Sequence, residues 1–460
     1  MDLVRANRLT GVALAVLAAA APWHMPAFAQ TVQLPLFSAC TPASPPQLPA
    51  RWRAVGLLSP FGTTQLDVGE FVYDGTLPVM RATVYGLESG AVDLLITNTD
   101  TYLLSGPYSG PNGCASLGRR FSPPSAQWLP GQALCVGETS LAATPVQWWK
   151  TPVSEARANW FWFKSDTRLP WRSLFAIPTP DPAVIGDYAM TYFPTFAALS
   201  ETNLSRLRDF CVSRASRNTT AAAAAAQNAR ALMEIRNPPA EAERLARIGT
   251  LIPGLSQQAC AGMTPARWPD QFMMTAVITP IRYEYDPFPS VIHYDWTGAG
   301  ALGVILFQPR EQPPAPVLMF SLKRGIGYDA RLVPPGKLEC RPIYPGVVRP
   351  DWMAAAGCKC KGVIDRNPAL SPNEVTQILA CPIKHQEPRA MWSWYTTAGR
   401  PILFAEAAAA GSGLMLADYS TWQPGHRVPA AEFDFPQQCM APDSKALPTA
   451  SCVDCHSTRP

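Results

Sequence analysis

The chain has few charged residues and few histidines. Charged residues make up 16% of its 460 residues, and the formal net charge is +4 with five histidines counted as neutral. No block or stripe of lysine and arginine occurs, which excludes the electrostatic footprint of a nucleic-acid-binding protein. After residue 29, no apolar stretch reaches the length of a transmembrane helix. The composition therefore predicts neither a nucleic-acid partner nor a transmembrane segment.

Sequence signatures of common enzyme classes are also missing. The chain has no G-x-S-x-G elbow, no H-E-x-x-H helix, no P-loop and no dinucleotide-binding glycine motif. Its acidic residues are scattered and form no general acid–base pair. The sequence does not decide whether the protein is an enzyme, and any catalytic residue stays unknown.

The N-terminus has the three parts of a secretory signal peptide. Arg5 and Arg8 precede an apolar run from Leu9 to Ala21, and Ala27-Phe28-Ala29 forms an A-x-A cleavage site before Gln30. We therefore expect residues 1–29 to be removed and the mature protein to be periplasmic or secreted. Such a compartment is oxidising and permits both disulfides and covalent haem attachment.

Proline and tryptophan are abundant, with 49 and 14 residues. Short β-prone runs stand between turn signals, such as Ala91–Ile96 and Gly303–Phe307. Runs of this length also occur as buried helix segments, but the flanking Gly, Pro and Asn favour strands. The fold class is predicted to be mainly β, α+β overall, with antiparallel sheets.

An internal duplication sets the predicted architecture. Several features recur in the same order: Pro-Ala-Arg-Trp at 49–52 and 265–268, Tyr-Asp at 73–74 and 285–286, Cys114 and Cys340, Trp160/Trp162 and Trp392/Trp394, and Cys211 and Cys439. The tryptophans of each pair stand two residues apart, so on a strand both rings face the same side. The prediction is β repeat 1 at 30–211, a helical connector at 212–259, β repeat 2 at 260–439 and a tail at 440–460.

The cysteine count suggests disulfides within each repeat. The predicted pairs are Cys40–Cys211, Cys114–Cys135 and Cys260–Cys439, with Cys340 bonded to Cys358 or Cys360 and Cys381 bonded to the other. The spacing alone leaves other connectivities open. Both repeats come out even, so the two tail cysteines are surplus to this framework.

The tail contains a C-x-x-C-H motif formed by Cys452, Cys455 and His456. In c-type cytochromes the two thiols bind the haem vinyl groups, and the histidine is the proximal iron ligand. The motif predicts covalent haem c held by these residues. A plain or redox-active disulfide, a zinc site and chance occurrence are the alternatives.

A sixth ligand to the haem iron would have to come from elsewhere in the chain. The candidates are His426, His293, His385 and Met440, and each of them is more commonly a surface or core residue than a ligand. Because the tail is too short to bury a porphyrin, the haem would dock against the β repeats or stay exposed.

The repeats also resemble the ependymin family within the wider group of LolA-like half-barrels. The features that carry the resemblance are a Tyr-Asp strand, a mid-domain cysteine, a tryptophan strand and a Pro-then-Cys end: Tyr73-Asp74, Cys114, Trp148/Trp149 or Trp160, and Pro194 with Cys211; then Tyr285-Asp286, Cys340, Trp392, and Pro424 with Cys439. The resemblance implies a curved antiparallel sheet with an apolar cavity for a lipid-like ligand. The duplication and the haem motif are not part of that pattern.

Two functions follow from these observations. The first is an exported monohaem c-type protein with haem on its tail, which carries out electron transfer with a redox partner or haem-based redox chemistry. The alternative is a non-enzymatic periplasmic or extracellular binding protein, whose duplicated β domains hold a hydrophobic ligand or a protein partner. The sequence gives no oligomeric state.

Overall fold

The computed structural model describes most of the chain between residues 34 and 434. The positions outside the described part are 1–33, 43, 89, 105–112, 120, 125–127, 130, 142–143, 155–156, 177–187, 215–240, 281–284, 298–300, 308–315, 324–325, 334–336, 344–347, 366–373, 383–389, 408–413 and 435–460. The predicted signal peptide and the C-x-x-C-H tail therefore lie outside the described residues. In the described part, no helix is long and apolar enough to cross a membrane.

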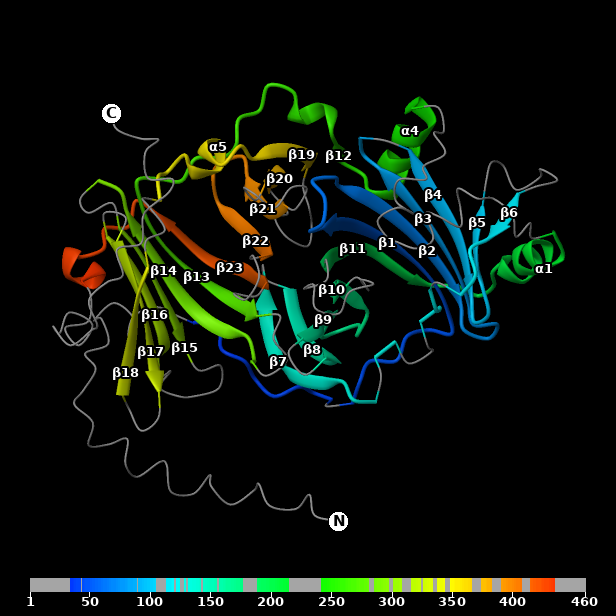
Figure 1. The fold of residues 1–460 in the computed structure, drawn as a ribbon, viewed down its shortest axis with the longest axis horizontal. Coiled ribbons are helices and arrows are strands. Elements are labelled where there is room, and N and C mark those ends of the chain that lie inside the picture. Colours follow the sequence, from blue (N-terminus) through cyan, green and yellow to red (C-terminus); the bar gives the residue numbers. More distant parts are fainter. Residues whose placement is uncertain are drawn as a thin grey trace, which may run out of the picture.

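The described chain forms two antiparallel sheets, which confirms the prediction of a mainly β fold (Figure 1). The strands of the first sheet are β1 Arg51–Pro60, β2 Asp67–Asp74, β3 Val79–Gly86, β4 Ala91–Thr97, β5 Thr101–Leu104, β6 Cys114–Ser116, β7 Leu134–Leu141, β8 Thr144–Ser154, β9 Arg157–Lys164, β10 Pro170–Ala176 and β11 Tyr188–Ala198. The strands of the second sheet are β12 Leu255–Ser256, β13 Gln271–Pro280, β14 Phe288–Asp295, β15 Ala301–Phe307, β16 Pro316–Lys323, β17 Ile326–Val333, β18 Lys337–Ile343, β19 Lys359–Ile364, β20 Thr376–Pro382, β21 Ala390–Thr396, β22 Pro401–Ala407 and β23 Leu414–Pro424.

Both sheets have the same topology. In sheet 1 the order is β6-β5-β4-β3-β2-β1-β11-β10-β9-β8-β7, so the first and last strands pair in the middle. In sheet 2 the order is β12-β19-β20-β21-β22-β23-β13-β14-β15-β16-β17-β18. Each strand of sheet 1 therefore has an equivalent in sheet 2: β1 corresponds to β13, β2 to β14, and so on to β11 and β23. The short β12 of sheet 2 has no equivalent in sheet 1. The shared topology agrees with an internal duplication.

The strand register corrects one pair of residues used to recognise the repeat. Tyr73 and Asp74 end β2 opposite Trp52 and Arg51, and Tyr294 and Asp295 end β14 opposite Phe272 and Gln271. The structural equivalent of Tyr73-Asp74 is thus Tyr294-Asp295, and not Tyr285-Asp286, which precedes β14. In both pairs a threonine follows two residues after the aspartate. The hydroxyl group of Thr76 donates to the Asp74 carboxylate at 2.6 Å, and that of Thr297 donates to the Asp295 carboxylate at 2.9 Å.

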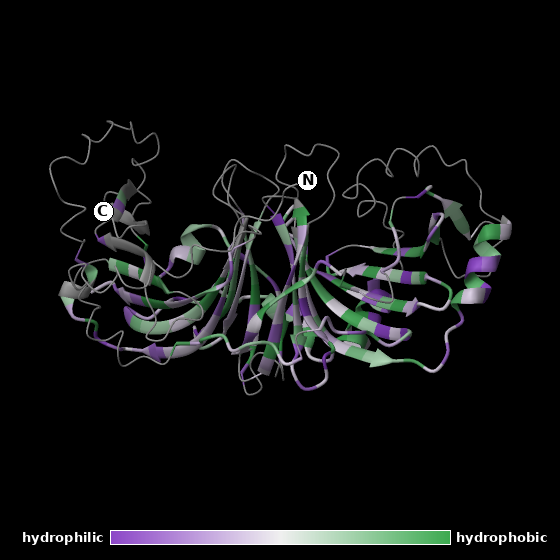
Figure 2. Ribbon diagram, turned by 90° about the horizontal axis from the view of Figure 1, so that it is seen from below, coloured by the Kyte–Doolittle hydropathy of each residue, from purple (hydrophilic) through white to green (hydrophobic). Residues whose placement is uncertain are grey.

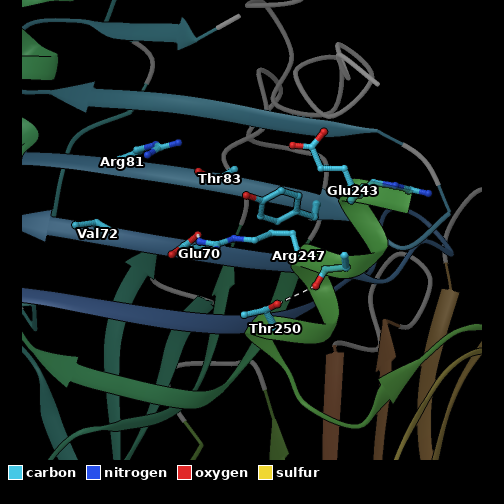
Figure 3. Close-up of a pocket in the computed structure, with 10 residues that line it drawn as sticks. Glu70, Val72, Arg81, Thr83, Glu243, Arg247 and Thr250 are labelled. Atoms are coloured by element: carbon cyan, nitrogen blue, oxygen red, sulfur yellow. Dashed lines mark hydrogen bonds and ion pairs between the residues drawn. The ribbon is translucent and has the colours of Figure 1, made fainter. Parts of the chain in front are cut away.

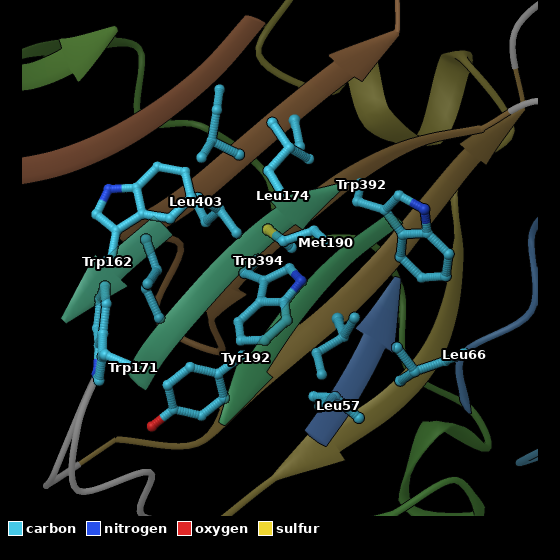
Figure 4. Packing of buried hydrophobic residues seen from close by; sticks show 14 of the residues in the cluster. Leu57, Leu66, Trp162, Trp171, Leu174, Met190, Tyr192, Trp392, Trp394 and Leu403 are labelled. Carbon is cyan, nitrogen blue, oxygen red and sulfur yellow. The ribbon is translucent and has the colours of Figure 1, made fainter. Parts of the chain in front are cut away.

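The two sheets pack against each other in the middle of the molecule. One hydrophobic cluster, here called the shared core, contains tryptophans from both repeats: Trp148, Trp160, Trp162 and Trp171 from the first, and Trp392 and Trp394 from the second (Figure 4). We call the face of each sheet that carries these residues its shared face, and the other its far face. Hydrophobic and hydrophilic residues alternate along many strands, as expected of strands whose two faces have different neighbours (Figure 2). The prediction that the paired tryptophans share one face is confirmed.

Polar contacts also join the two repeats. The guanidinium group of Arg172 makes a bidentate ion pair with Asp418, with both N–O distances at 2.6 Å. The side chains are only 2% and 6% exposed, so the pair is buried within the interface. Arg172 also lies over the ring of Trp162, 4.1 Å from its centroid. The Trp392 indole N–H donates to the carbonyl oxygen of Pro60 at 3.0 Å.

Short helices lie at the edges of the sheets. α4 Glu241–Leu251 lies within the predicted helical connector, whereas α1 Leu204–Arg214 begins before it, and residues 215–240 between the two helices are outside the described part. α5 Trp352–Ala355 and the 3-10 turns η2 Gln258–Cys260 and η3 Ala430–Phe433 belong to repeat 2. In α4, Ile248 and Leu251 pack into the shared core.

The disulfides confirm cross-linking within the repeats but not the predicted partners. The observed bonds are Cys40–Cys135, Cys114–Cys211, Cys260–Cys360 and Cys358–Cys381. The predicted Cys40–Cys211, Cys114–Cys135 and Cys260–Cys439 are wrong, and Cys340 bonds to neither Cys358 nor Cys360. Only the pairing of Cys381 with one of those two is confirmed. Cys340 is itself disulfide-bonded.

The observed disulfide partners follow from the positions of the two ends of repeat 1 in the sheet. The N-terminal segment lies beside β7, where Ser38 and Glu138 form a β-bridge, and this brings Cys40 to Cys135. Helix α1 packs on the other end of the sheet, where Cys211 joins Cys114 of β6 in one buried cluster. The first and last cysteines of repeat 1 are thus at opposite sheet edges, a separation that sequence order does not reveal.

Candidate ligand-binding site

An apolar pocket lies on the far face of sheet 1. Its volume is about 460 Å³, within the range of about 300–1,000 Å³ typical of small-molecule sites. The lining residues are uncharged and mostly aromatic: Trp52, Phe71, Met80, Ser122, Pro124, Trp128, Phe175, Thr191 and Phe193. Five neighbouring strands, β10, β11, β1, β2 and β3, supply six of them, and the segment around residues 121–129 supplies the rest.

Strand alternation places these side chains in the pocket. Successive residues on a strand point to opposite faces, so Phe71 points to the far face while Val68 packs into the shared core. In β11, Phe193 packs on the far face while Tyr192 belongs to the shared core. Strands β2 and β11 thus supply apolar surface to both faces, and this leaves a lined pocket on the side away from the other repeat.

Trp128 forms the cover of the far face. Its ring is stacked on that of Trp52, with centroids 6.0 Å apart and an interplanar angle of 16°. The edge of Phe193 meets it at 5.8 Å. Stacked and edge-on contacts of this kind hold aromatic rings in defined positions. The pocket wall is therefore an interlocked aromatic cluster.

Gly56 lies under the pocket and keeps its floor open. A Cβ atom at this position would meet the side chains of Thr191, Phe71 and Phe193 at 2.7, 3.2 and 3.6 Å. All three residues line the pocket. The strand register makes Ala276 of β13 the equivalent of Gly56 in repeat 2, where that methyl group is fully buried. The absence of a side chain at Gly56 is therefore a property of repeat 1, not a requirement of the fold.

The far face of sheet 2 has a different cover. Trp268 packs edge-on against Phe272, Tyr294 and Trp352, with ring centroids 5.1, 5.3 and 5.7 Å apart. Its indole N–H donates to the hydroxyl group of Tyr395 at 2.9 Å. Burial, the larger effect, raises the pKa of Tyr395 above its usual value, so this phenol stays neutral. Repeat 2 thus uses this face as a hydrogen-bonded aromatic core.

The residues predicted to hold haem are only partly described. Cys452, Cys455, His456, His385 and Met440 lie outside the described residues. His293 is 1% exposed on the shared face of β14, and its ring meets that of Phe433 at 5.0 Å. His426 is half-buried just after β23. Within the described ranges, no cluster of three or more His, Cys, Asp or Glu residues could hold a metal ion.

The pocket residues were not singled out from the sequence. In the sequence Trp52 stands out only as part of the repeated Pro-Ala-Arg-Trp, and no motif contains Phe71, Met80 or Phe193. The sequence does contain one signal, consecutive aromatic residues that would point to both faces of a strand, as in Trp160-Phe161-Trp162-Phe163. That pattern indicates a strand covered on both faces, but it does not show which face contains a cavity.

Comparisons with known proteins give weak structural likenesses only. No protein-family profile matches the chain, and no curated protein matches it. Among solved structures, it is similar to the Pseudomonas aeruginosa MucA/MucB complex, with 11% identity over 64% of this chain and 86% of that one, and a TM-score of 0.20. A LolA superfamily protein from Nitrosomonas europaea gives 11% identity over 37% and 93%, with a TM-score of 0.22. At these scores, neither likeness carries an argument about function.

Proposed function

We propose that the protein is an exported, non-enzymatic binding protein that holds a hydrophobic, lipid-like ligand in the apolar pocket of repeat 1. The observation that carries the proposal is the aromatic pocket of about 460 Å³ above Gly56. Disulfides in both repeats support an oxidising compartment, which agrees with a periplasmic or secreted protein. Removal of apolar ligand surface from water would supply the binding free energy.

The test uses the fluorescent apolar probe N-phenyl-1-naphthylamine with the purified, delipidated protein. We expect saturable binding accompanied by a change in tryptophan emission, since Trp52 and Trp128 line the pocket. Gly56→Ala adds a methyl group that must displace the Thr191 side chain and crowds Phe71, both of which line the pocket. Because the methyl group and the displaced side chains take up space that the ligand would fill, we expect the affinity to fall about tenfold, or about 1.4 kcal/mol of binding free energy.

The matched control is Gly131→Ala, because a Cβ atom there has no neighbour within 4 Å. This variant should bind the probe as the unmodified protein does. Equal affinity of Gly56→Ala and the unmodified protein, or no saturable binding at all, would contradict the proposed site. Mass spectrometry of lipids extracted from the protein as purified identifies the natural ligand class.

A second candidate function is haem binding at the C-terminal tail, and the pairing of the other cysteines favours it. In the described part no cysteine is free, and eight of the described cysteines pair with one another. By analogy with Cys114–Cys211 in repeat 1, we infer that Cys439 is the partner of Cys340. We propose that Cys452 and Cys455 would then form thioethers to haem c, with His456 as the axial ligand.

Co-expression with a cytochrome maturation system tests this second function. We expect a haem-staining band on a denaturing gel and a c-type reduced-minus-oxidised spectrum, both lost in Cys452→Ala/Cys455→Ala. Absence of the band from the unmodified protein would rule out covalent haem. In the haem-loaded protein, His426→Ala and His293→Ala would test distal ligation, because loss of a sixth ligand converts a low-spin spectrum to high spin.

A further inference from the structure

A second cleft lies on the shared face of sheet 1, under helix α4 (Figure 3). Its volume is about 550 Å³. Strands β2 and β3 form its floor with Glu70, Val72, Arg81, Thr83 and Tyr85, and α4 forms its wall with Glu243, Arg244, Ala246, Arg247 and Thr250. Unlike the apolar pocket, this cleft is lined by arginines, hydroxyl groups and carboxylates.

The fold itself does not require these polar residues. The register makes Glu70, Arg81 and Thr83 equivalent to Val291, Gly303 and Ile305 of repeat 2. There the equivalents of Glu70 and Thr83 are apolar, and Val291 and Ile305 pack in a hydrophobic cluster. The same sheet position is thus stable without charges, so the charged cleft of repeat 1 calls for a separate explanation.

Most charges in the cleft are paired within the protein. Glu70 accepts hydrogen bonds from Arg53 at 2.8 Å and from Arg247 at 2.6 Å. Burial by itself would raise the pKa of Glu70, but these two arginines hold it below its usual value, so Glu70 is ionised. Arg81 makes a bidentate pair with Asp93 at 3.0 and 2.8 Å. These pairs fix the floor of the cleft in one geometry.

Arg244 is the exception. It is 5% exposed and occupies the buried side of α4, one turn before Ile248. Its Nη1 donates to the carbonyl oxygen of Gly86 at 2.6 Å, and no carboxylate in the described ranges pairs with it. A guanidinium has five N–H donors, and a buried cation without a counter-charge is costly unless something supplies one.

The charge balance of the cleft is positive. Arg53, Arg81, Arg244 and Arg247 stand against Glu70, Asp93 and Glu243, four cations against three carboxylates. Glu243 is exposed on α4 at the side of the cleft away from Glu70 (Figure 3). The unmatched positive charge is therefore that of the buried Arg244. It lies with Arg247 on the wall of the cleft that faces Tyr85 and Thr83.

We propose that this cleft binds a small oxyanion, a ligand carrying a carboxylate or phosphate group, with Arg244 as its counter-charge. The planar guanidinium fork matches both groups, and Arg247 and the hydroxyl group of Tyr85 add further donors along the cleft. The Thr83 hydroxyl group already donates to Asp93 at 2.9 Å. The site is separate from the apolar pocket, because it lies on the opposite face of β2 and β3. It does not depend on the proposed hydrophobic ligand.

Calorimetric titration with inorganic phosphate, and separately with succinate, tests the proposal at fixed ionic strength. We expect at least one of them to bind with a Kd below about 1 mM, about −4 kcal/mol. Arg244→Gln should weaken that binding at least tenfold. Arg247→Gln, which changes an exposed residue of the same helix, should weaken it at least threefold. Arg206→Gln, on the exposed side of α1, is the matched control and should leave it within twofold.

The thermal stability of the ligand-free variants separates a binding arginine from a structural one. Because Arg244 has no carboxylate partner, the Tm of Arg244→Gln without phosphate should equal or exceed that of the unmodified protein. A Tm lower by more than about 5 °C would show a structural arginine and overturn the proposal. It would equally be overturned if neither anion bound more tightly than chloride, or if both cleft variants bound like the control.

Discussion

At the scale of single residues, Asp74 shows how the end of a strand hairpin is fixed. Its carboxylate accepts four hydrogen bonds, from the Thr76 amide at 3.0 Å, the Thr76 hydroxyl at 2.6 Å, Thr202 at 2.8 Å and Arg51 at 2.9 Å. Burial alone would raise its pKa, but these donors lower the pKa to about 2. The pattern Tyr-Asp-x-Thr recurs at 294–297, so the sequence contained this motif twice.

The lowered pKa predicts how the stability depends on pH. Folding lowers the pKa of Asp74 from an ordinary value of 3.8 to about 2, so its ionised form stabilises the fold above about pH 4. This contribution is lost as the pH falls from about 4 through 2. Asp74→Asn should lower the free energy of unfolding by about 2 kcal/mol at pH 7 and by almost nothing at pH 2. Urea denaturation at both pH values measures this.

Asp209→Asn is the control for this prediction, because Asp209 is 68% exposed and its ion pair in the described part is with its neighbour Arg208. It should change stability little at either pH. A loss in Asp74→Asn that is equally large at pH 2 and pH 7 would show that the side chain acts through packing and not through its charge.

At the scale of elements, the buried pair Arg172–Asp418 distinguishes the two repeats. The register makes Arg172 of β10 equivalent to Leu403 of β22, and Asp418 of β23 equivalent to Tyr192 of β11. Both equivalents are apolar members of the shared core. If repeat 1 packed against a second copy of repeat 1, Arg172 would face the equivalent residue Tyr192 and not Asp418, and would have no counter-charge there. The ion pair therefore favours the pairing of two different repeats.

Removal of one partner of this pair should be strongly destabilising. Arg172→Met leaves the Asp418 carboxylate buried without a counter-charge, which costs about 3–5 kcal/mol. The double variant Arg172→Met/Asp418→Leu should recover most of that loss, since both charges are gone and the site becomes apolar. Denaturant titration of the two single variants and the double variant completes the cycle. A double variant no more stable than Arg172→Met would argue against this account.

At the scale of the whole molecule, the two repeats share one core. Tyr192 of repeat 1 meets Trp394 of repeat 2 edge-on at 6.1 Å, and Leu57 and Leu66 belong to the same cluster as Trp392 (Figure 4). Lys361 of β19 pairs with Glu88 of repeat 1 at 2.6 Å. Because apolar surface of each repeat is buried by the other, the two sheets should unfold together.

Trp394→Ala tests this coupling. Removal of a fully buried tryptophan costs about 3–5 kcal/mol. If the core is shared, hydrogen exchange followed by mass spectrometry should show faster exchange in β9 and β10 of repeat 1 as well as in repeat 2. Trp422→Ala, on the far face of sheet 2, is the comparison and should affect repeat 2 mainly. Unchanged protection of β9 in Trp394→Ala would mean that the repeats unfold independently.

The sequence by itself determined the class of fold, the presence of two repeats and the placing of Trp160, Trp162, Trp392 and Trp394 on one face. These features are local, since alternation along a strand and recurrence along a chain need no knowledge of distant contacts. It did not determine the disulfide partners, because Cys40 and Cys211 are brought to opposite edges of sheet 1 by strand order. The apolar pocket and the Arg244 cleft were decided only by the tertiary structure. Each is built from segments far apart in sequence: the pocket lies on the face of sheet 1 that the other repeat leaves uncovered, and the cleft lies on the shared face where α4 packs beside β2 and β3.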